Sequence, residues 1–422
     1  MQDYCALKAV EFSKYRVFEQ RQRLELKPLT LLFGHNSAGK SAALRLLPIL
    51  AASAQRRRRN ANLAVLDYSS PALREALFQD LIYNGQVAGG LQFGLCWSDV
   101  TYDVTLRDLG TGGEVIGNFN VTVEAKTYSG GPAESEGREN LEVEIDGKKS
   151  HWKFAGLCPY AADTEKGEEV VEVLRERLDH FASSVRWLGA VRAAVPRLFE
   201  MRPGVDGEIR PDGSGVAEAI RISAAAGDGA AEAVSKWLEK SCQCSLSFAA
   251  SDEALLHNRR FYPFDVITAT GRHIAVRDVG EGIAQALPVV MLCHQARLGQ
   301  LGDSPILAFE QPELHLHPAA AVHLADEVIA CIARGSHASH VVETHAESML
   351  LSVQIAIVER RIRPEDVVVY WVSPGDSGTT LRAITFDESG FAVGGWPQGV
   401  FRETLDQARR LAQLRIDPNP AA

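Results

Sequence analysis

Gly34-His35-Asn36-Ser37-Ala38-Gly39-Lys40-Ser41 is the stretch of this 422-residue chain that decides its fold. It fits the pattern G-x-x-x-x-G-K-S, it follows an apolar run at residues 29–33, and an apolar helical pattern comes after it. The two glycines let successive N–H groups converge on an anion, and the following helix points its positive end at the same place. The sequence therefore predicts a phosphate-binding loop in which Lys40 contacts the β- and γ-phosphates of ATP and Ser41 binds Mg²⁺.

The composition is that of a folded, soluble protein. Hydrophobic residues make up 46% of the chain and charged residues 23%, and the net charge is -10. This balance excludes general disorder and argues against a surface wholly committed to nucleic acid. An odd number of scattered cysteines, seven in all, predicts a reducing cytoplasm, and Cys242 and Cys244 are interpreted as structural. The chain has no apolar run of about 20 residues, so we expect no membrane segment.

One local basic run, Arg56 to Arg59, follows the predicted P-loop helix. Cations at the end of a helix complement its dipole, so a solvated helix end is the favoured interpretation. A DNA-binding path is the alternative, because four adjacent arginines also match phosphate groups.

The order of apolar segments predicts an α/β nucleotide-binding head that is split along the sequence. Residues 1–107 form its first half and 261–374 its second half; an α+β region at 108–260 is inserted between them, and 375–422 form a tail domain. No helix is a long heptad run, which excludes a coiled-coil arm. Loops are expected at 110–113, 129–137 and 204–215, helices at 166–183, 217–225, 230–239, 283–297, 319–333 and 346–360, and strands at 6–12, 29–33, 91–97, 102–106, 120–126, 141–145, 185–188, 264–269, 306–310, 340–343 and 367–371.

A second motif, Ile306-Leu307-Ala308-Phe309-Glu310-Gln311-Pro312-Glu313, is an apolar strand that ends in acidic residues. The carboxyl ends of parallel strands meet at one edge of a sheet, where a carboxylate can hold Mg²⁺ and its waters against phosphates. Glu310 is the residue so placed.

A third motif, His340-Val341-Val342-Glu343-Thr344-His345, is another apolar strand with a polar end. A histidine at that position can donate a hydrogen bond to the γ-phosphate and so distinguish ATP from ADP. A histidine that only caps the next helix is the alternative. Because the other two motifs occur in the same chain, we favour the γ-phosphate contact as the role of His345.

These residues resemble the ABC-type ATPases of the AAA group, and more closely the bacterial members that carry a C-terminal domain of unknown function. The resemblance rests on the P-loop, on E-Q-P-E-L-H-L-H-P at 310–318 and on E-T-H-x-E at 343–347. Segments at 187–197 and 389–401 also resemble parts of that family. The resemblance implies a P-loop ATPase head of the ABC type, split by the insertion.

The resemblance also implies that two heads meet face to face, with each ATP between one P-loop and the partner's signature motif. The matching glycine turn here holds Gly280 and Gly282, although transporter-type signatures have a serine where Gly280 stands. By its order along the chain, Gln79 matches the family's metal-contacting glutamine. His315 and His317 are interpreted as structural or interface residues rather than metal ligands.

Gln311 is the main departure from the family pattern. It stands where most ABC-type ATPases have the glutamate that polarises the attacking water, and an amide cannot accept a proton as a carboxylate does. Either hydrolysis is slow and the protein is mainly an ATP-dependent clamp, or another acid serves: Glu313, Glu343 or Glu347. We favour Glu313 and predict that Glu313→Gln abolishes residual ATPase activity while ATP binding is kept.

The leading hypothesis is a cytoplasmic ATPase, a homodimer or higher homo-oligomer of heads, that dimerises on ATP and regulates a separate effector. The resemblance implies a nuclease or similar effector, because such ATPases often stand beside one in antiphage defence. A DNA-binding repair clamp of the recombination type, with the basic run along its DNA path, is the alternative. A transporter subunit is disfavoured, since transporter ATPases lack the E-Q-P-E-L-H-L-H-P run.

Overall fold

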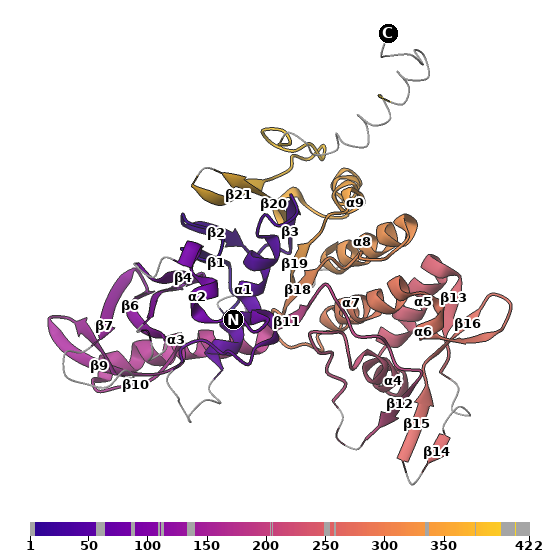
Figure 1. The fold of residues 1–422 in the computed structure, drawn as a ribbon, viewed down its shortest axis with the longest axis horizontal. Coiled ribbons are helices and arrows are strands. Elements are labelled where there is room, and N and C mark those ends of the chain that lie inside the picture. The colour runs from indigo at the N-terminus through magenta and orange to yellow at the C-terminus, as the bar shows by residue number, and fades with distance from the viewer. Residues whose placement is uncertain are drawn as a thin grey trace.

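A computed structural model describes residues 5–55, 64–85, 89–108, 110, 114–132, 140–202, 204, 206–248, 254–256, 259–333, 337–375, 377–397 and 410. A six-stranded sheet at its centre carries the P-loop (Figure 1). Its order is β11-β18-β19-β3-β20-β21, with the first five strands parallel and β21 antiparallel at the edge. The strands are β3 (Leu29–Gly34), β11 (Val185–Leu188), β18 (Ile306–Glu310), β19 (Ser339–Glu343), β20 (Val367–Gly375) and β21 (Gly378–Ile384).

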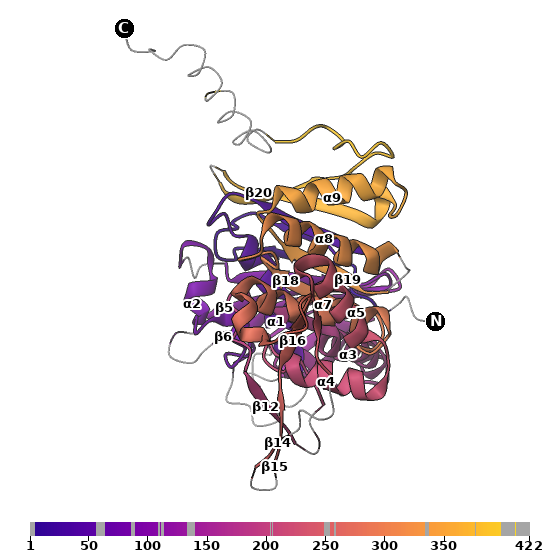
Figure 2. The ribbon, with the colours of Figure 1, turned by 90° about the vertical axis from the view of Figure 1, so that its right-hand side faces the viewer.

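Both faces of this sheet are buried, because alternate side chains of its strands enter two different cores. On β3, Leu32 packs with α1 (Lys40–Ala54) and α3 (Glu165–Ser184), whereas Leu31 and Phe33 pack on the opposite side. That second side is covered by α7 (Glu281–Arg297), α8 (Pro318–Ala333) and α9 (Glu347–Val358), as Figures 1 and 2 show. The near-continuous apolar character of β3 and β18 follows from this double burial.

A nine-stranded antiparallel sheet covers the other side of α1 and α3, at the left of Figure 1. It crosses the expected boundary at residues 107 and 108, because β5 pairs with β6 along its whole length. Strands from both sides of the expected boundary thus share one sheet. The division of the chain into a head and an insertion stays a prediction. The strands, in spatial order, are β10 (Cys158–Ala162), β9 (Lys148–Ala155), β8 (Asn140–Ile145), β7 (Lys126–Pro132), β6 (Glu114–Val123), β5 (Val100–Asp108), β4 (Leu91–Cys96), β1 (Ala9–Ser13) and β2 (Gln22–Glu25).

The loop expected at 129–137 is wrong for its first part, since β7 extends through residue 132. Glycines there indicate a close approach rather than a turn. A Cβ at Gly130 would lie 2.5 Å from Cε1 of Phe119 on the neighbouring strand β6, so the missing side chain gives that ring its space.

A smaller lobe packs on α7 at the right of Figure 1 and includes the expected helices at 217–225 and 230–239. Within the described residues, no helix is both long and apolar enough to cross a membrane. The lobe and the remaining short helices comprise β12 (Leu198–Met201), α4 (Val216–Ala226), α5 (Ala230–Cys242), β13 (Cys244–Leu246), β14 (Ala254–Leu256), β15 (Arg259–Pro263), β16 (Asp265–Thr268), β17 (His273–Ala275), α6 (Val276–Val279) and, on the nine-stranded side, α2 (Phe78–Leu81).

Candidate functional site

The loop between β3 and α1 has the conformation that its two glycines allow. Gly34 has φ 143° and Gly39 has φ 103°, values that side chains other than glycine rarely adopt. A Cβ at Gly34 would also lie 2.2 Å from the carbonyl oxygen of Val372 on β20, and one at Gly39 would lie 2.5 Å from Cγ2 of Val17. The packing therefore demands glycine at both positions.

Lys40 and Ser41 open α1 and are fixed by hydrogen bonds. The Lys40 Nζ donates to the carbonyl oxygens of Gly34, at 3.0 Å, and His35, at 2.6 Å. Lys40 is only 3% exposed, and this burial lowers the pKa of its ammonium group. The Ser41 Oγ donates to Oε1 of Glu343 at 2.8 Å, which joins the P-loop to the end of β19.

A pocket of about 440 Å³ opens at this loop. It brings together residues from all three predicted motifs, because β18, β19 and β3 are parallel neighbours whose carboxyl ends meet at one edge. Arg16 and Arg45 also line it, and no sequence motif pointed to them. The lining residues are Arg16, Asn36, Ser37, Gly39, Lys40, Ser41, Ala42, Arg45, Gln311, Glu343 and His345.

Glu343 is the carboxylate that faces the pocket. It is 2% exposed, and its Oε1 accepts from Ser41 and, at 3.5 Å, from Nε2 of Gln311. Its Oε2 is buried and has no hydrogen-bond partner among the described residues. Burial raises the pKa of Glu343, and the charge of Glu310 raises it further. The side chain therefore offers a partly uncompensated oxygen next to the P-loop serine.

Glu310, the predicted metal carboxylate, is placed differently. It ends β18 directly beside Glu343, but both of its oxygens are bound by side chains of the head. Arg45 donates Nε to Oε1 at 2.6 Å and Nη2 to Oε2 at 2.5 Å, and the Trp187 indole N–H donates to Oε1 at 3.0 Å. Glu310 is 1% exposed and does not line the pocket in this structure, and its role as a metal ligand stays a prediction.

Arg45 occupies a position that the sequence could have indicated. It lies one helical turn after Ser41 on α1, and residues four apart share a face of a helix. A second arginine, Arg192, supports the same strand end from behind, because its Nη2 donates to the carbonyl oxygen of Glu310 at 3.0 Å. Burial lowers the pKa of Arg192 to about 10.

Glu313, the favoured catalytic base, lies behind the pocket rather than in it. Its Oε1 accepts from Thr344 Oγ1 at 2.7 Å and from the backbone N–H of His345 at 3.0 Å. Its Oε2 is buried without a hydrogen-bond partner in the described part of the chain. Glu313 therefore holds the segment that presents His345, whose side chain lines the pocket. Partial desolvation in the pocket wall lowers the pKa of that imidazole, and the charge of Lys40 lowers it further.

Gln79 does not join the other predicted residues. It is exposed on α2 and donates from Nε2 to Oδ2 of Asp108 at 3.5 Å, so in this structure it contacts the end of β5 and does not line the pocket. Gln79 was predicted as a metal-contacting residue from its order along the chain, and chain order does not determine the distance between Gln79 and the P-loop. The basic run at Arg56 to Arg59 lies outside the described residues.

Gly280 and Gly282 lie at the start of α7, as predicted. Gly280 is the N-cap, with φ 136°, and provides no side-chain cap for the first N–H groups of this 17-residue helix. A Cβ at Gly282 would lie 2.3 Å from the carbonyl oxygen of His315, which seats the turn against the loop after β18. His315 and His317 are both exposed.

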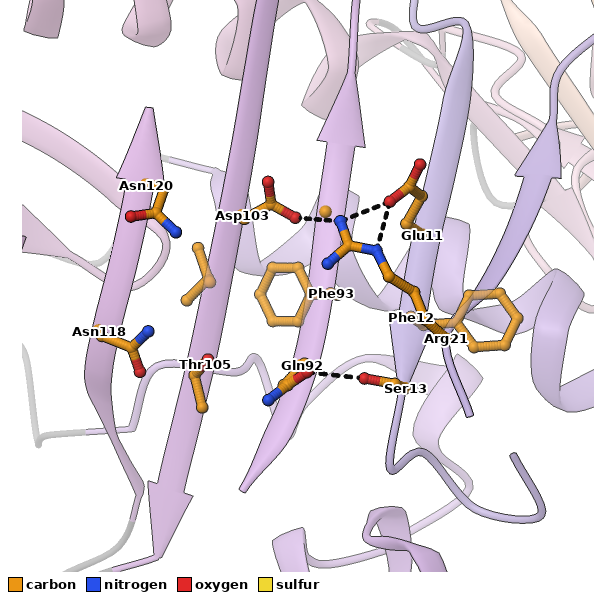
Figure 3. A pocket seen from close by; sticks show the side chains of 12 residues that line it. Glu11, Phe12, Ser13, Arg21, Gln92, Phe93, Asp103, Thr105, Asn118 and Asn120 are labelled. Carbon is orange, nitrogen blue, oxygen red and sulfur yellow. Dashed lines mark hydrogen bonds and ion pairs between the residues drawn. The ribbon is translucent and has the colours of Figure 1, made fainter. Parts of the chain in front are cut away.

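A second pocket, of about 240 Å³, lies on the face of the nine-stranded sheet (Figure 3). Its charged groups neutralise one another, since Arg21 donates Nε to Glu11 and Nη2 to Asp103, each at 2.6 Å. Ser13 and Gln92 are paired at 2.8 Å. The cations and free carboxylate oxygen that suit a phosphate and its metal are thus found at the P-loop pocket.

A glycine-rich loop between a central parallel strand and a buried helix, with lysine and serine at the helix start, defines a P-loop site in an α/β fold. No family model matches the chain, and a search of curated proteins gives no match.

Among solved structures, an Smc head bound to the C-winged-helix domain of ScpA matches 90% of this chain and 98% of its own, with 11% identity and a TM-score of 0.45. An Smc head with an extended coiled coil, bound to the C-terminal domain of ScpA derived from Pyrococcus furiosus, matches 97% and 98%, with 11% identity and a TM-score of 0.45. An SMC head from Thermotoga maritima matches 89% and 98%, with 10% identity and a TM-score of 0.39. At these values the matches assign no function to this chain.

Proposed function

We propose that this protein is an ABC-type ATPase that binds Mg·ATP at the P-loop pocket, dimerises on ATP and regulates a partner effector. The observation that carries the proposal is the junction of Lys40, Ser41 and Glu343 in one pocket. A buried ammonium, a hydroxyl and a carboxylate with one unpartnered oxygen are the groups that a metal-bound triphosphate requires.

The residues fit the nucleotide and its metal. Lys40 would hold the β- and γ-phosphates, and the free N–H groups at the start of α1 would bind phosphate oxygens. Ser41 and the free oxygen of Glu343 would hold Mg²⁺, which neutralises phosphate charge when bound. Arg16 and Arg45 add positive charge at the rim, although Arg45 is already paired with Glu310.

Hydrolysis would depend on a carboxylate at another position, because residue 311 is a glutamine. The Gln311 amide lines the pocket and can orient a water but cannot take its proton. Glu343 lines the pocket and has a raised pKa, whereas Glu313 binds Thr344 and the backbone of His345. The geometry therefore favours Glu343 as the acidic group for turnover and Glu313 as the residue that positions His345.

The partner part of the proposal rests on α7 and on the E-Q-P-E-L-H-L-H-P and E-T-H-x-E runs. The uncapped glycine turn at Gly280 leaves backbone donors free for the γ-phosphate held by a second head. The two runs support a role beside a nuclease or similar effector, in DNA-linked or antiphage defence.

Equilibrium binding of a fluorescent ATP analogue, with and without Mg²⁺, tests the nucleotide site. Lys40→Ala should weaken binding at least about 100-fold, because it removes the cation that faces the phosphates. Lys236→Ala, at an exposed position on α5, is the matched control and should bind like the wild type. Unchanged binding in Lys40→Ala would contradict the site.

Dimerisation is tested separately by light scattering after size exclusion. Wild-type protein with Mg²⁺ and a non-hydrolysable ATP analogue should shift from monomer to dimer, because the nucleotide stays bound and uncleaved. A wild type that binds the analogue and stays monomeric would refute dimerisation and leave the nucleotide site intact. Co-purification with co-expressed genomic neighbours, with wild type and Lys40→Ala in parallel, then identifies an ATP-dependent partner.

A further inference from the structure

A cluster of two cysteines and a histidine lies in the second core, away from the P-loop edge. Cys293 is on α7, Cys331 is on α8, and His340 is the second residue of β19. All three are 0% exposed, and their ligand atoms lie within 4.8 Å of one another. Three elements that are separate in sequence thus bring metal-binding side chains to one buried point.

The histidine is held in the form that binds metals. Its Nδ1 lies 3.2 Å from the carbonyl oxygen of Pro28, which can only accept, so Nδ1 carries the proton. The other nitrogen, Nε2, is therefore unprotonated. It is buried, and the side chain that interacts with the imidazole is that of Cys331, another member of the cluster. A carbonyl that fixes one ring nitrogen while the other faces a metal is the usual arrangement at protein metal sites.

We propose that Cys293, Cys331 and His340 bind a zinc ion. Two thiolates and one neutral imidazole balance the charge of Zn²⁺, so the occupied cluster would be neutral within an apolar core. Around tetrahedral zinc the ligand atoms would be roughly 3.5–4 Å apart, which is within reach of the observed spacing through small side-chain rotations. The proposal does not depend on nucleotide binding.

A histidine and a glutamate lie near the two cysteines, one on α7 and one on α8. His294 follows Cys293 on α7, Glu327 lies one helical turn before Cys331 on α8, and their side chains are 3.3 Å apart. His294 is only 3% exposed. Glu327 is thus engaged by His294 and is not among the residues whose ligand atoms gather at the cluster, so a water would supply the fourth ligand.

The zinc would connect α7 and α8 to β19, the strand that ends at the pocket residue Glu343. α7 begins at the glycine turn proposed to face a second head, and β19 ends at Glu343. Ligands from α7, α8 and β19 would hold these elements in a fixed relation. Since folding creates the site, metal binding would also contribute directly to stability.

The test is metal analysis of the purified full-length protein from zinc-supplemented cells. We expect about one zinc per chain, loss of that zinc in Cys331→Ser, and loss in His340→Asn, whose amide can still donate to Pro28. Cys158→Ser, at a buried cysteine in the nine-stranded sheet, is the control and should keep the metal. Cys244→Ser should keep it too, which excludes the pair Cys242 and Cys244 as the source.

Cobalt binding keeps the proposal testable if a variant fails to fold. Wild-type protein stripped by a chelator should bind Co²⁺ and show thiolate-to-cobalt charge transfer with tetrahedral d–d bands. A wild type that binds neither metal would overturn the proposal. So would zinc retained in both ligand variants, or a Cys293–Cys331 disulfide detected by mass spectrometry of protein purified without reductant.

Discussion

The carboxyl ends of β18 and β19 differ although they look alike. Each strand ends in a glutamate after at least two apolar residues, the two glutamates lie opposite each other in parallel register, and both are almost completely buried. Glu310 is bound through both oxygens by Arg45 and Trp187, whereas Glu343 faces the P-loop serine and keeps one oxygen without a partner among the described residues. A strand-end carboxylate therefore takes its chemistry from its neighbours.

The difference follows from where the arginines lie. Arg45 sits on α1 below the P-loop and reaches the end of β18, so the negative charge there is neutralised within the protein. The end of β19 receives a hydroxyl and an amide, which stabilise a carboxylate less than a paired cation does. In this structure one glutamate is paired within the protein, and the other keeps an oxygen that has no partner among the described residues.

The largest expected effect is on turnover in Glu343→Gln. The amide can still accept from Ser41 but can neither take a proton nor balance a cation, so kcat should fall about 10²- to 10⁴-fold, with binding of metal-free ATP changed only a few-fold. Steady-state ATPase assays and nucleotide binding measure the two quantities. Loss of turnover in Glu313→Gln together with normal turnover in Glu343→Gln would instead place the base at Glu313.

The second effect is on stability in Glu310→Gln. Loss of the carboxylate leaves the guanidinium of Arg45 without its partner, and breaking a largely buried ion pair should cost about 3 kcal/mol. Urea unfolding gives the change. Glu359→Gln breaks an exposed glutamate–arginine pair and is the control, with an expected loss of less than about 1 kcal/mol. Equal losses in the two variants would remove the distinction between the two strand ends.

These two strand ends also mark how far sequence analysis reaches. The strand at 306–310 and the helix at 166–183 were predicted to within one residue at each end, because apolar periodicity is local. The P-loop conformation was likewise encoded in adjacent residues. The pairing of Arg45 with Glu310 joins positions 265 residues apart, and no local pattern reveals it. The glycines of β7 misled for a similar reason, since their partner Phe119 lies on another strand.

A third, smaller effect is on the pH dependence of stability. Burial raises the folded-state pKa of Glu343, so the folded protein favours the protonated side chain. This contribution is fully present below the unfolded-state pKa and is lost as pH rises through the folded-state pKa. Glu343→Gln lacks the ionisation, so its free energy of unfolding relative to wild type should increase with pH, by about 1.4 kcal/mol for each unit of pKa shift.

Urea unfolding of both proteins measures this difference. A range of about pH 4 to 8 covers the titration of carboxyl groups and extends above it. Glu359→Gln, whose carboxyl is exposed, should follow the wild type in parallel. A constant offset between wild type and Glu343→Gln would show that Glu343 titrates as an ordinary surface carboxyl.

The smallest effect is expected from Gln311→Glu, which introduces the glutamate that most ABC-type ATPases have at the position that Gln311 resembles. The amide nitrogen of residue 311 lies 3.5 Å from Oε1 of Glu343, so the substitution puts two carboxylates in one site. Like charges at this distance raise the pKa of one group, so a proton should be shared near neutral pH. We expect turnover at pH 7 to stay within about tenfold of wild type and to rise toward alkaline pH.

Gln311→Asn is the matched control, because its shorter amide loses the contact with Glu343 without adding charge. The pH–rate profiles of the two variants then separate charge from geometry. A rise of more than about 100-fold in Gln311→Glu, with the pH profile of the wild type, would mean that residue 311 alone limits hydrolysis. The end of β18 would then hold the missing base, and the free oxygen of Glu343 would serve the metal only.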